Sequence, residues 1–140
     1  MESDSYELFF DGCSKGNPGR SGAGAVLYKN NNELATNSLF IGDKETNNSA
    51  EYNGLIIGLE MAIKYNIKNL VVKGDSLLVI QQMTGKYQVK SNSLLQLYTN
   101  VKKLEKLFTK VVYQHVYRHD NKRADELANA SIVDVTTTYL

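Results

Sequence analysis

The first forty-five residues alternate between apolar and polar positions, a pattern that predicts β-strands. The strands are predicted at Tyr6–Phe10, Ala23–Tyr28 and Leu34–Ile41. The first runs into Asp11-Gly12, a dipeptide typical of turns, and glycine-rich and asparagine-rich turns over residues 15–22 and 29–33 separate the others. Because strands joined by short connections pair with one another, we expect three antiparallel neighbours.

From residue 49 onward the apolar residues return every three or four positions, which predicts helices. In the first helix, expected over residues 49–65, Gly54 and Gly58 indicate close packing against a sheet. The β-branched run at residues 70–75 predicts a buried parallel strand, because a helix precedes it as a crossover. The remaining elements are predicted as helices over 77–83, 94–108 and 124–131 and a strand over 111–117. The chain is therefore expected to be an α/β protein in the order β-β-β-α-β-α-α-β-α, with a five-stranded mixed sheet flanked by helices.

Length and composition narrow the class of protein. A chain of 140 residues with one cysteine forms one domain, 1–140, without an internal disulfide, and residues 1–4 and about 134–140 are expected to be tails. The acidic N-terminus is unlike a signal peptide, and no apolar run is long enough to span a membrane. We therefore expect a monomer without membrane association, located in the cytoplasm, the nucleoid or the nucleus.

The net charge of +1 conceals an uneven distribution. Between residues 64 and 123 there are twelve lysines and arginines against three acids, whereas acids predominate in the rest of the chain. One interpretation is a solvated helix face beside an acidic N-terminal part. The alternative is an anion-binding side of the molecule.

Four acids lie where the predicted elements meet. Asp11 and Asp75 end two strands, and parallel neighbours bring such residues to the same edge of a sheet. Glu51 and Asp125, near the starts of two helices, can reach that edge. Close carboxylates repel one another unless one is protonated or a divalent cation lies between them. Oxygen ligands without His or Cys favour Mg²⁺ or Mn²⁺, and two such ions promote phosphodiester hydrolysis.

Each acid also has a simpler interpretation. Asp11 suits a turn, and Glu51 can close a capping box with Asn48. Asp75-Ser76 can form the N-cap of the following helix, and Asp125 can interact with the dipole of its own helix. Taken separately these interpretations are plausible, but they do not account for the convergence of all four acids on one edge.

Four segments in this order resemble the motifs of type 1 ribonuclease H. They are Asp11-Gly12-Cys13-Ser14-Lys15-Gly16-Asn17-Pro18-Gly19, Thr46-Asn47-Asn48-Ser49-Ala50-Glu51, Gly74-Asp75-Ser76 and Asn121-Lys122-Arg123-Ala124-Asp125-Glu126-Leu127-Ala128. The resemblance covers nearly the whole chain. It implies that Asp11, Glu51, Asp75 and Asp125 bind two metal ions, Mg²⁺ with Mn²⁺ as a substitute. It also implies cleavage of the RNA strand of an RNA–DNA hybrid, which leaves a 5′-phosphate and a 3′-hydroxyl.

The same resemblance suggests residues that contact the hybrid. Main-chain groups at Gly12 and Cys13 are placed to test for the ribose 2′-hydroxyl. Short polar side chains in the other motifs suit the minor groove or a phosphate, and Arg118 matches an arginine of the compact members. The remaining expected contacts are Asn17, Asn47, Asn48, Ser76 and Asn121.

Two departures from the better-known bacterial pattern matter. The basic, tryptophan-rich protrusion of those enzymes is replaced by a short segment at residues 85–91, so the chain is similar to compact archaeal and retroelement members. Their mobile loop with a histidine is here only residues 117–121, where His119 is a candidate for proton transfer that does not align residue for residue.

The sequence therefore predicts a metal-dependent hybrid endonuclease. Two alternatives remain: a catalytically silent module of the same fold that binds hybrids or a partner, and a DNA-directed nuclease of the wider superfamily.

Overall fold

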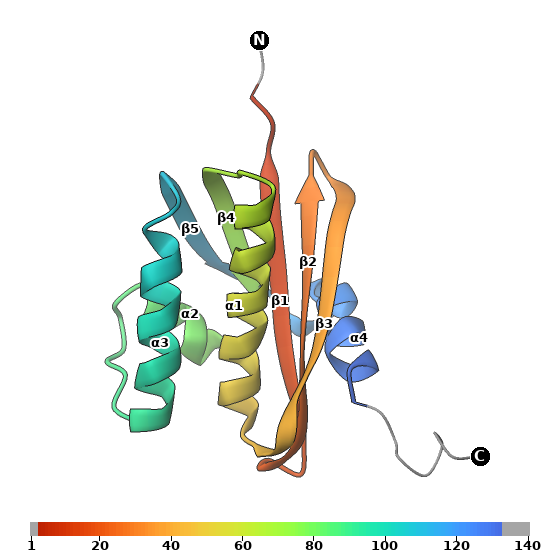
Figure 1. Ribbon diagram of the computed structural model, residues 1–140, viewed down its shortest axis with the longest axis vertical. Coiled ribbons are helices and arrows are strands. Elements are labelled where there is room, and N and C mark those ends of the chain that lie inside the picture. Colours follow the sequence, from red (N-terminus) through yellow and green to blue (C-terminus); the bar gives the residue numbers. More distant parts are fainter. Residues whose placement is uncertain (1–2, 133–140) are drawn as a thin grey trace, which may run out of the picture.

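The computed structural model describes residues 3–132, which form five strands, four α-helices and one 3₁₀ turn (Figure 1). The strands are β1 (Tyr6–Lys15), β2 (Gly19–Lys29), β3 (Asn32–Glu45), β4 (Asn69–Gly74) and β5 (Lys110–His115). The helices are α1 (Asn47–Lys64), α2 (Leu77–Met83), α3 (Asn92–Glu105), the 3₁₀ turn η1 (Arg118–Asp120) and α4 (Lys122–Ala130). The predicted order of strands and α-helices is confirmed, and η1 is an addition that the apolar pattern did not indicate.

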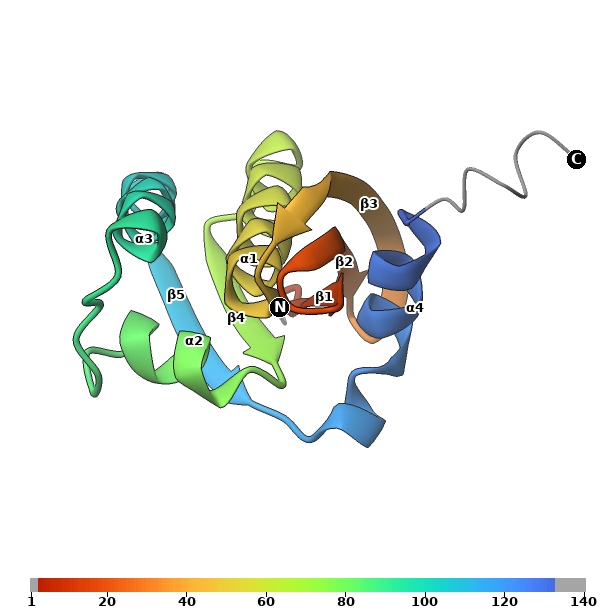
Figure 2. The same ribbon diagram turned by 90° about the horizontal axis from the view of Figure 1, so that it is seen from below.

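A single mixed sheet in the order β3-β2-β1-β4-β5 forms the centre of the molecule. The three N-terminal strands are antiparallel, whereas β4 lies parallel to β1 and β5 parallel to β4, as predicted. Helices α1 and α3 cover one face of the sheet, and α4 lies against β2 on the other side (Figure 2). The core between the sheet and α1 includes Leu8, Phe10, Tyr52 and Leu55, all fully buried.

The parallel register brings two of the predicted site acids together. The ladder between β1 and β4 ends at the pair Phe10 and Gly74, and the next residues along the two strands are Asp11 and Asp75. Because β1 and β4 run in the same direction, both acids leave the ladder at the same edge of the sheet. The expected convergence therefore follows directly from strand pairing.

Two glycines let α1 pack against β1. A Cβ on Gly54 would lie 2.3 Å from the carbonyl oxygen of Asp11, and one on Gly58 would lie 2.6 Å from a methyl group of Leu8. Both distances are shorter than any ordinary carbon contact. The prediction that these glycines mark a close approach to the sheet is confirmed, and this approach brings Glu51 over the edge where Asp11 lies.

The first strand is longer than the alternation of apolar residues predicted. Asp11-Gly12 does not form a turn, because β1 continues to Lys15 with each residue paired against β2. The turn is confined to residues 16–18, where Gly16 has φ +110°. The polar end of β1 is thus held in an extended conformation by its main-chain hydrogen bonds to β2, and not by the burial of apolar side chains.

The second hairpin is tight and depends on asparagine. Asn30 and Asn31, which connect β2 to β3, have φ values of 50° and 69°. Positive φ at both central positions is the conformation of the turns that suit the twist of antiparallel strands, and asparagine tolerates it better than most residues. Ser5 donates its N–H to the Asn30 side chain, and Asp4 forms an ion pair with Lys29, so the described part of the expected N-terminal tail is attached to this hairpin. The expected C-terminal tail, about 134–140, lies outside the described residues.

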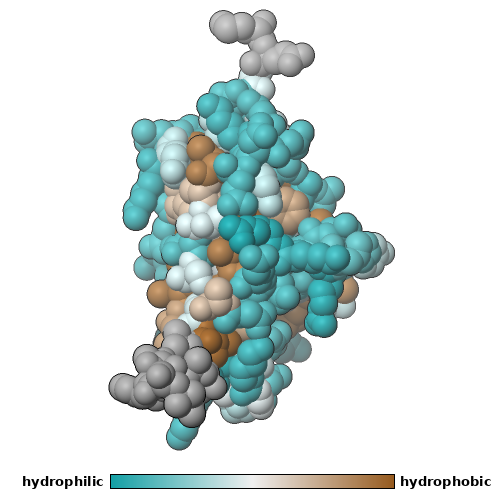
Figure 3. Space-filling view, turned by 90° about the vertical axis from the view of Figure 1, so that its right-hand side faces the viewer, coloured by the Kyte–Doolittle hydropathy of each residue, from teal (hydrophilic) through white to brown (hydrophobic). Residues whose placement is uncertain are grey.

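The face that carries the β2–β3 hairpin and α4 is mostly hydrophilic, with small apolar patches between polar residues (Figure 3). Leu39 and Phe40 of β3 are exposed apolar residues, at 44% and 40% exposure. Within residues 3–132, none of the helices has the length and apolar character that crossing a membrane requires.

Candidate active site

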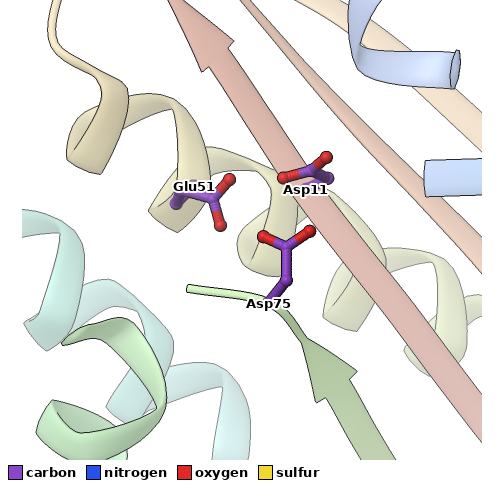
Figure 4. A group of neighbouring side chains, drawn as sticks. All are labelled: Asp11, Glu51 and Asp75. Carbon is purple, nitrogen blue, oxygen red and sulfur yellow. The ribbon is translucent and has the colours of Figure 1, made fainter. Parts of the chain in front are cut away.

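Three carboxylates from three different elements face one another at the carboxyl edge of β1 and β4 (Figure 4). Asp11 comes from β1, Glu51 from α1 and Asp75 from the residue that follows β4. One oxygen of each lies within 4.8 Å of the others. This spacing is suited to a shared cation.

Burial and mutual repulsion oppose full ionisation of these acids. Asp11 is 5% exposed and Glu51 is 2% exposed. Burial raises the pKa of Asp11 to about 6, and the charge of Asp75 adds to this effect. Burial also raises the pKa of Glu51 well above its usual range, with further contributions from its hydrogen bond to Asp11 and from the Asp11 charge. Without a cation the cluster therefore favours a shared proton, and a divalent ion would remove that need.

The backbone of Gly12 holds two of the acids in place. Its N–H donates to Asp11 Oδ1 at 2.9 Å and to Glu51 Oε1 at 2.7 Å. A Cβ at this position would lie 2.2 Å from the carbonyl carbon of Ala50, so only glycine fits between β1 and α1. The need for glycine here arises from the close packing of α1 on β1, and the expected contact of Gly12 with a ribose stays a prediction.

The capping roles considered for the acids are wrong. Helix α1 begins with Thr46 as its N-cap, so Glu51 does not close a capping box with Asn48. Helix α2 is capped by the hydroxyl of Ser76 and not by Asp75. Both acids are therefore free to serve the cluster.

One buried carboxylate oxygen has no partner among the described residues. Glu51 Oε2 is inaccessible to solvent and accepts no hydrogen bond. An unpaired buried acceptor carries a desolvation cost of about 1–3 kcal/mol unless a cation or water satisfies it. Together with an all-oxygen donor set, this oxygen shows that the residues fit a hard divalent ion such as Mg²⁺ or Mn²⁺.

The fourth predicted acid, Asp125, lines the same cavity but lies outside the three-carboxylate cluster. The cavity has a volume of about 350 Å³. Asn129, one helical turn further along α4, donates its amide to Asp125 Oδ1 at 3.1 Å and to the Asp125 carbonyl at 2.9 Å. Asp125 is therefore held at the wall of the cavity by the side chain of Asn129.

Asn121 connects the acids from behind. It is 1% exposed, and its amide donates to Asp75 Oδ2 at 3.2 Å and to the carbonyl of Phe10 at 2.9 Å. Its own main-chain carbonyl accepts from the N–H of Asp125 at 3.1 Å. Asn121 is therefore a buried hydrogen-bond partner of Asp75, and its expected contact with substrate stays a prediction.

The other predicted contact residues divide into two groups. Cys13, Asn47, Ser76 and Arg118 line the cavity with the four acids. Asn17, Asn48 and His119 are not among its lining residues.

Those three lie around the cavity in different settings. The carbonyl of the Asn17 side chain accepts the N–H of Asn47 at 2.9 Å, so it satisfies a free donor at the start of α1. Asn48 is half-buried in the first turn of α1. His119 is largely exposed, pairs with Asp120 at 3.3 Å and stacks on Tyr117.

Two residues of the cavity were missed by reasoning from the sequence. Lys15 and Asn129 both line it, and Lys15 Nζ donates to Asn129 Oδ1 at 2.6 Å. The alternation of β1 places Lys15 on the same face as Asp11, which was a usable signal. The Asp11-Gly12 pair, which is typical of a turn, obscures this signal because it suggests that the strand ends before Lys15.

The mixed sheet, together with acids from β1, α1, the end of β4 and α4 at one edge, defines a protein of the ribonuclease H-like class. A family model described as reverse transcriptase-like matches residues 9–131. The chain is 44% identical over 121 residues to bifunctional protein Rv2228c of Mycobacterium tuberculosis, covering 85% of this chain and 33% of that protein. It thus spans about one third of the length of this relative.

Full-length relatives and solved structures agree with that match. Ribonuclease H of Pseudomonas fluorescens is 35% identical over 147 residues, covering 94% of this chain and 93% of that enzyme. The N-terminal RNase H domain of Rv2228c superposes with a TM-score of 0.90 at 38% identity, covering 99% of this chain and 100% of that one. LC11-RNase H1, solved in complex with an RNA/DNA hybrid, superposes with a TM-score of 0.86 at 34% identity, covering 91% and 96%. The chain belongs to the type 1 ribonuclease H family.

Proposed function

We propose that this protein hydrolyses the RNA strand of RNA–DNA hybrids with two divalent ions, Mg²⁺ or Mn²⁺, and leaves a 5′-phosphate and a 3′-hydroxyl. The observation that carries this proposal is the cluster of Asp11, Glu51 and Asp75, with one buried oxygen of Glu51 that has no partner among the described residues. The likeness to an RNase H1 solved in complex with an RNA/DNA hybrid supports the choice of substrate.

The residues that line the cavity have two roles, metal binding and the positioning of the metal ligands. Asp11, Glu51, Asp75 and Asp125 would hold the ions, which when bound activate water and stabilise the leaving oxygen of an in-line displacement. Gly12 fixes the carboxylates of Asp11 and Glu51 through its N–H. Holding ligands in one geometry before substrate arrives reduces the reorganisation needed during the reaction.

Substrate recognition needs a phosphate contact and a ribose contact. Arg118 is an exposed residue that lines the cavity, and its guanidinium group suits phosphate oxygens. A 2′-hydroxyl distinguishes RNA from DNA at a given site. Because the N–H of Gly12 is already bonded to two carboxylates, Cys13, Asn47 and Ser76 are the better candidates for reading it.

The decisive experiment compares substrates. The protein is incubated with MgCl₂ and end-labelled RNA–DNA hybrid, duplex DNA, duplex RNA and single strands, and the product ends are identified. We expect cleavage of the RNA in the hybrid alone, with 5′-phosphate ends. Preferential cleavage of DNA would replace the proposal with the DNA-directed alternative, and equal cleavage of every substrate would overturn the specificity for hybrids.

Substitution of Asp11 tests the silent-module alternative. Asp11→Asn removes one ligand charge but can still accept the Gly12 N–H, so we expect a folded protein with cleavage reduced at least about 100-fold. Asp43→Asn is the matched control, because Asp43 is exposed on β3 and 79% of its side chain is accessible. A wild-type protein that binds hybrid without cutting it would establish the silent module instead.

A further inference from the structure

Lys15 is an exposed, positively charged residue that lines the cavity of the four acids. It ends β1 on the face that also carries Asp11 and Cys13, and it lines the cavity with the four acids. Its backbone position is fixed, because Gly19 approaches so closely that a Cβ there would lie 1.9 Å from the Lys15 carbonyl oxygen. The lysine therefore has a defined origin beside the carboxylates.

The side chain of Asn129 links Lys15 to Asp125. Its carbonyl oxygen accepts from Lys15 Nζ at 2.6 Å, while its amide donates to Asp125 Oδ1 at 3.1 Å. The Asn129 side chain thus binds the Lys15 ammonium group through its oxygen and the Asp125 carboxylate through its nitrogen. This arrangement orients the ammonium group toward the cavity without neutralising its charge.

Lys15 has unused capacity for an anion. An ammonium group has three N–H donors, and among the described residues one of them is bonded, to Asn129. Within residues 3–132, no carboxylate lies close enough to Lys15 Nζ to form an ion pair. Among those residues, Lys15 and Arg118 supply the positive charge of the cavity, and they reach it from different elements, β1 and η1.

We propose that Lys15 binds a phosphate of the nucleic acid strand that enters the catalytic cavity, and that Asn129 is the residue that positions it. This inference rests on the proposed function, because the ligand is a backbone phosphate of the substrate. Lysine binds phosphate as a point charge, so its contribution is expected in substrate binding and in the salt dependence of binding.

The test measures KM, kcat and the salt dependence of KM for an RNA–DNA hybrid with the wild type and with Lys15→Gln. We expect KM to rise about three- to tenfold with kcat little changed, which corresponds to the loss of one hydrogen bond to a charged group in a solvated site. The slope of log KM against log salt concentration should decrease by about 0.9, the value for one lost phosphate contact.

Matched variants separate charge from structure. Lys15→Arg keeps the charge and is expected to retain most of the wild-type salt slope. Lys29→Gln is the control, because Lys29 ends β2 at the opposite end of the same hairpin and pairs with Asp4. It should leave both KM and the slope unchanged.

A double-mutant cycle tests the positioning role of Asn129. Asn129→Ala should raise KM, and the Lys15→Gln/Asn129→Ala pair should raise it by less than the product of the two single effects. Additive effects would mean that Asn129 does not act through Lys15, and would overturn that part of the proposal.

Failure of the inference is distinct from failure of the proposed function. If the wild type cleaves the hybrid while Lys15→Gln keeps its salt slope, the phosphate contact is refuted and the nuclease activity stands. A lower kcat with unchanged KM would also refute it. If the wild type does not cleave the hybrid, direct binding of the uncut hybrid to the same variants gives the salt slopes, and unchanged slopes there overturn the inference as well.

Discussion

At the scale of single residues, the site is made of side chains that are costly to bury alone. Glu51 is almost fully buried, with one oxygen bonded to Gly12 and the other without a partner among the described residues. The pKa of Asp11 depends on its hydrogen bond with Glu51, and the negative charge of Asp75 raises it. Such an arrangement stores unfavourable electrostatic energy in the metal-free protein, which a cation would release.

The raised pKa of Asp11 makes the metal-free protein pH-sensitive. A group whose pKa is higher in the folded state stabilises below its unfolded value, and that stability is lost as the pH rises from about 4 through about 6. Asp11→Asn should therefore increase the free energy of unfolding at pH 7 in EDTA by about 1–3 kcal/mol. Urea unfolding at pH 4.5 and pH 7 measures this, with Asp43→Asn as the control. An Asp11→Asn protein less stable than wild type at pH 7 would contradict it.

Asn121 bonds to both strands that carry the site acids, so its substitution should affect stability and metal binding together. Asn121→Asp would place a further carboxylate next to Asp75 and remove a donor to both Asp75 and Phe10. We expect destabilisation of about 2–4 kcal/mol and a higher Mg²⁺ concentration for half-maximal activity. Asn100→Asp, an exposed position on α3, should change neither quantity. Unfolding curves and Mg²⁺ titrations decide between these outcomes.

At the scale of elements, glycines set how closely the helices approach the sheet. Gly54 and Gly58 admit α1 on one face, and Gly22 and Gly24 of β2 admit α4 on the other. Gly24 is paired with Asp11 across the two strands. The contact of α4 with Gly24 therefore lies next to Asp11, and α4 carries Asp125. The distance at which α4 packs on β2 therefore also sets the position of Asp125 relative to Asp11.

Gly24→Ala tests this coupling. Its Cβ would lie 2.5 Å from the carbonyl oxygen of Ala124 and 2.5 Å from the nitrogen of Ala128, so α4 must move outward. We expect destabilisation of about 1–3 kcal/mol and reduced cleavage, because Asp125 moves with its helix. Gly42→Ala is the control, since its Cβ would meet only the flexible side chain of Glu45 at 3.3 Å. Thermal unfolding and hybrid cleavage are measured for both, and equal effects would refute the argument.

At the scale of the whole molecule, the site depends on residues from both ends of the chain. Asp11 and Asp125 are 114 positions apart, and strand β1, helix α1, strand β4 and helix α4 must all dock before the acids meet. Repulsion among the acids opposes that docking, whereas any cation that binds only the folded state favours it.

Mg²⁺ should therefore stabilise the whole domain through the acids. At a concentration of about 100 times its dissociation constant, a ligand that binds only the folded state adds about 2.7 kcal/mol. We expect the unfolding temperature at pH 7 to rise as MgCl₂ is added, and to rise much less at pH 4.5, where protons compete for Asp11 and Glu51. Differential scanning fluorimetry measures this. An equal rise in Asp11→Asn would show that Mg²⁺ acts elsewhere.

The sequence by itself determined the element order, the mixed sheet and the placement of acids at one edge of that sheet. Each of these depends on local patterns: alternation, helical periodicity, and acids at the ends of apolar runs. Gly54 and Gly58 were also interpretable, because glycine weakens a helix and is kept inside one mainly where the backbone must pack closely against a neighbour.

Only the tertiary structure decided how the polar residues share the site. The N–H of Gly12 binds the carboxylate of Glu51 because α1 packs against β1 at that point. Asn121 lies buried behind Asp75, and Asn129 joins Lys15 to Asp125, through contacts between residues 46 and 114 positions apart. Hydrogen bonds between distant short side chains leave no periodic trace in a sequence, so they appear only when the strands and helices that carry them are docked.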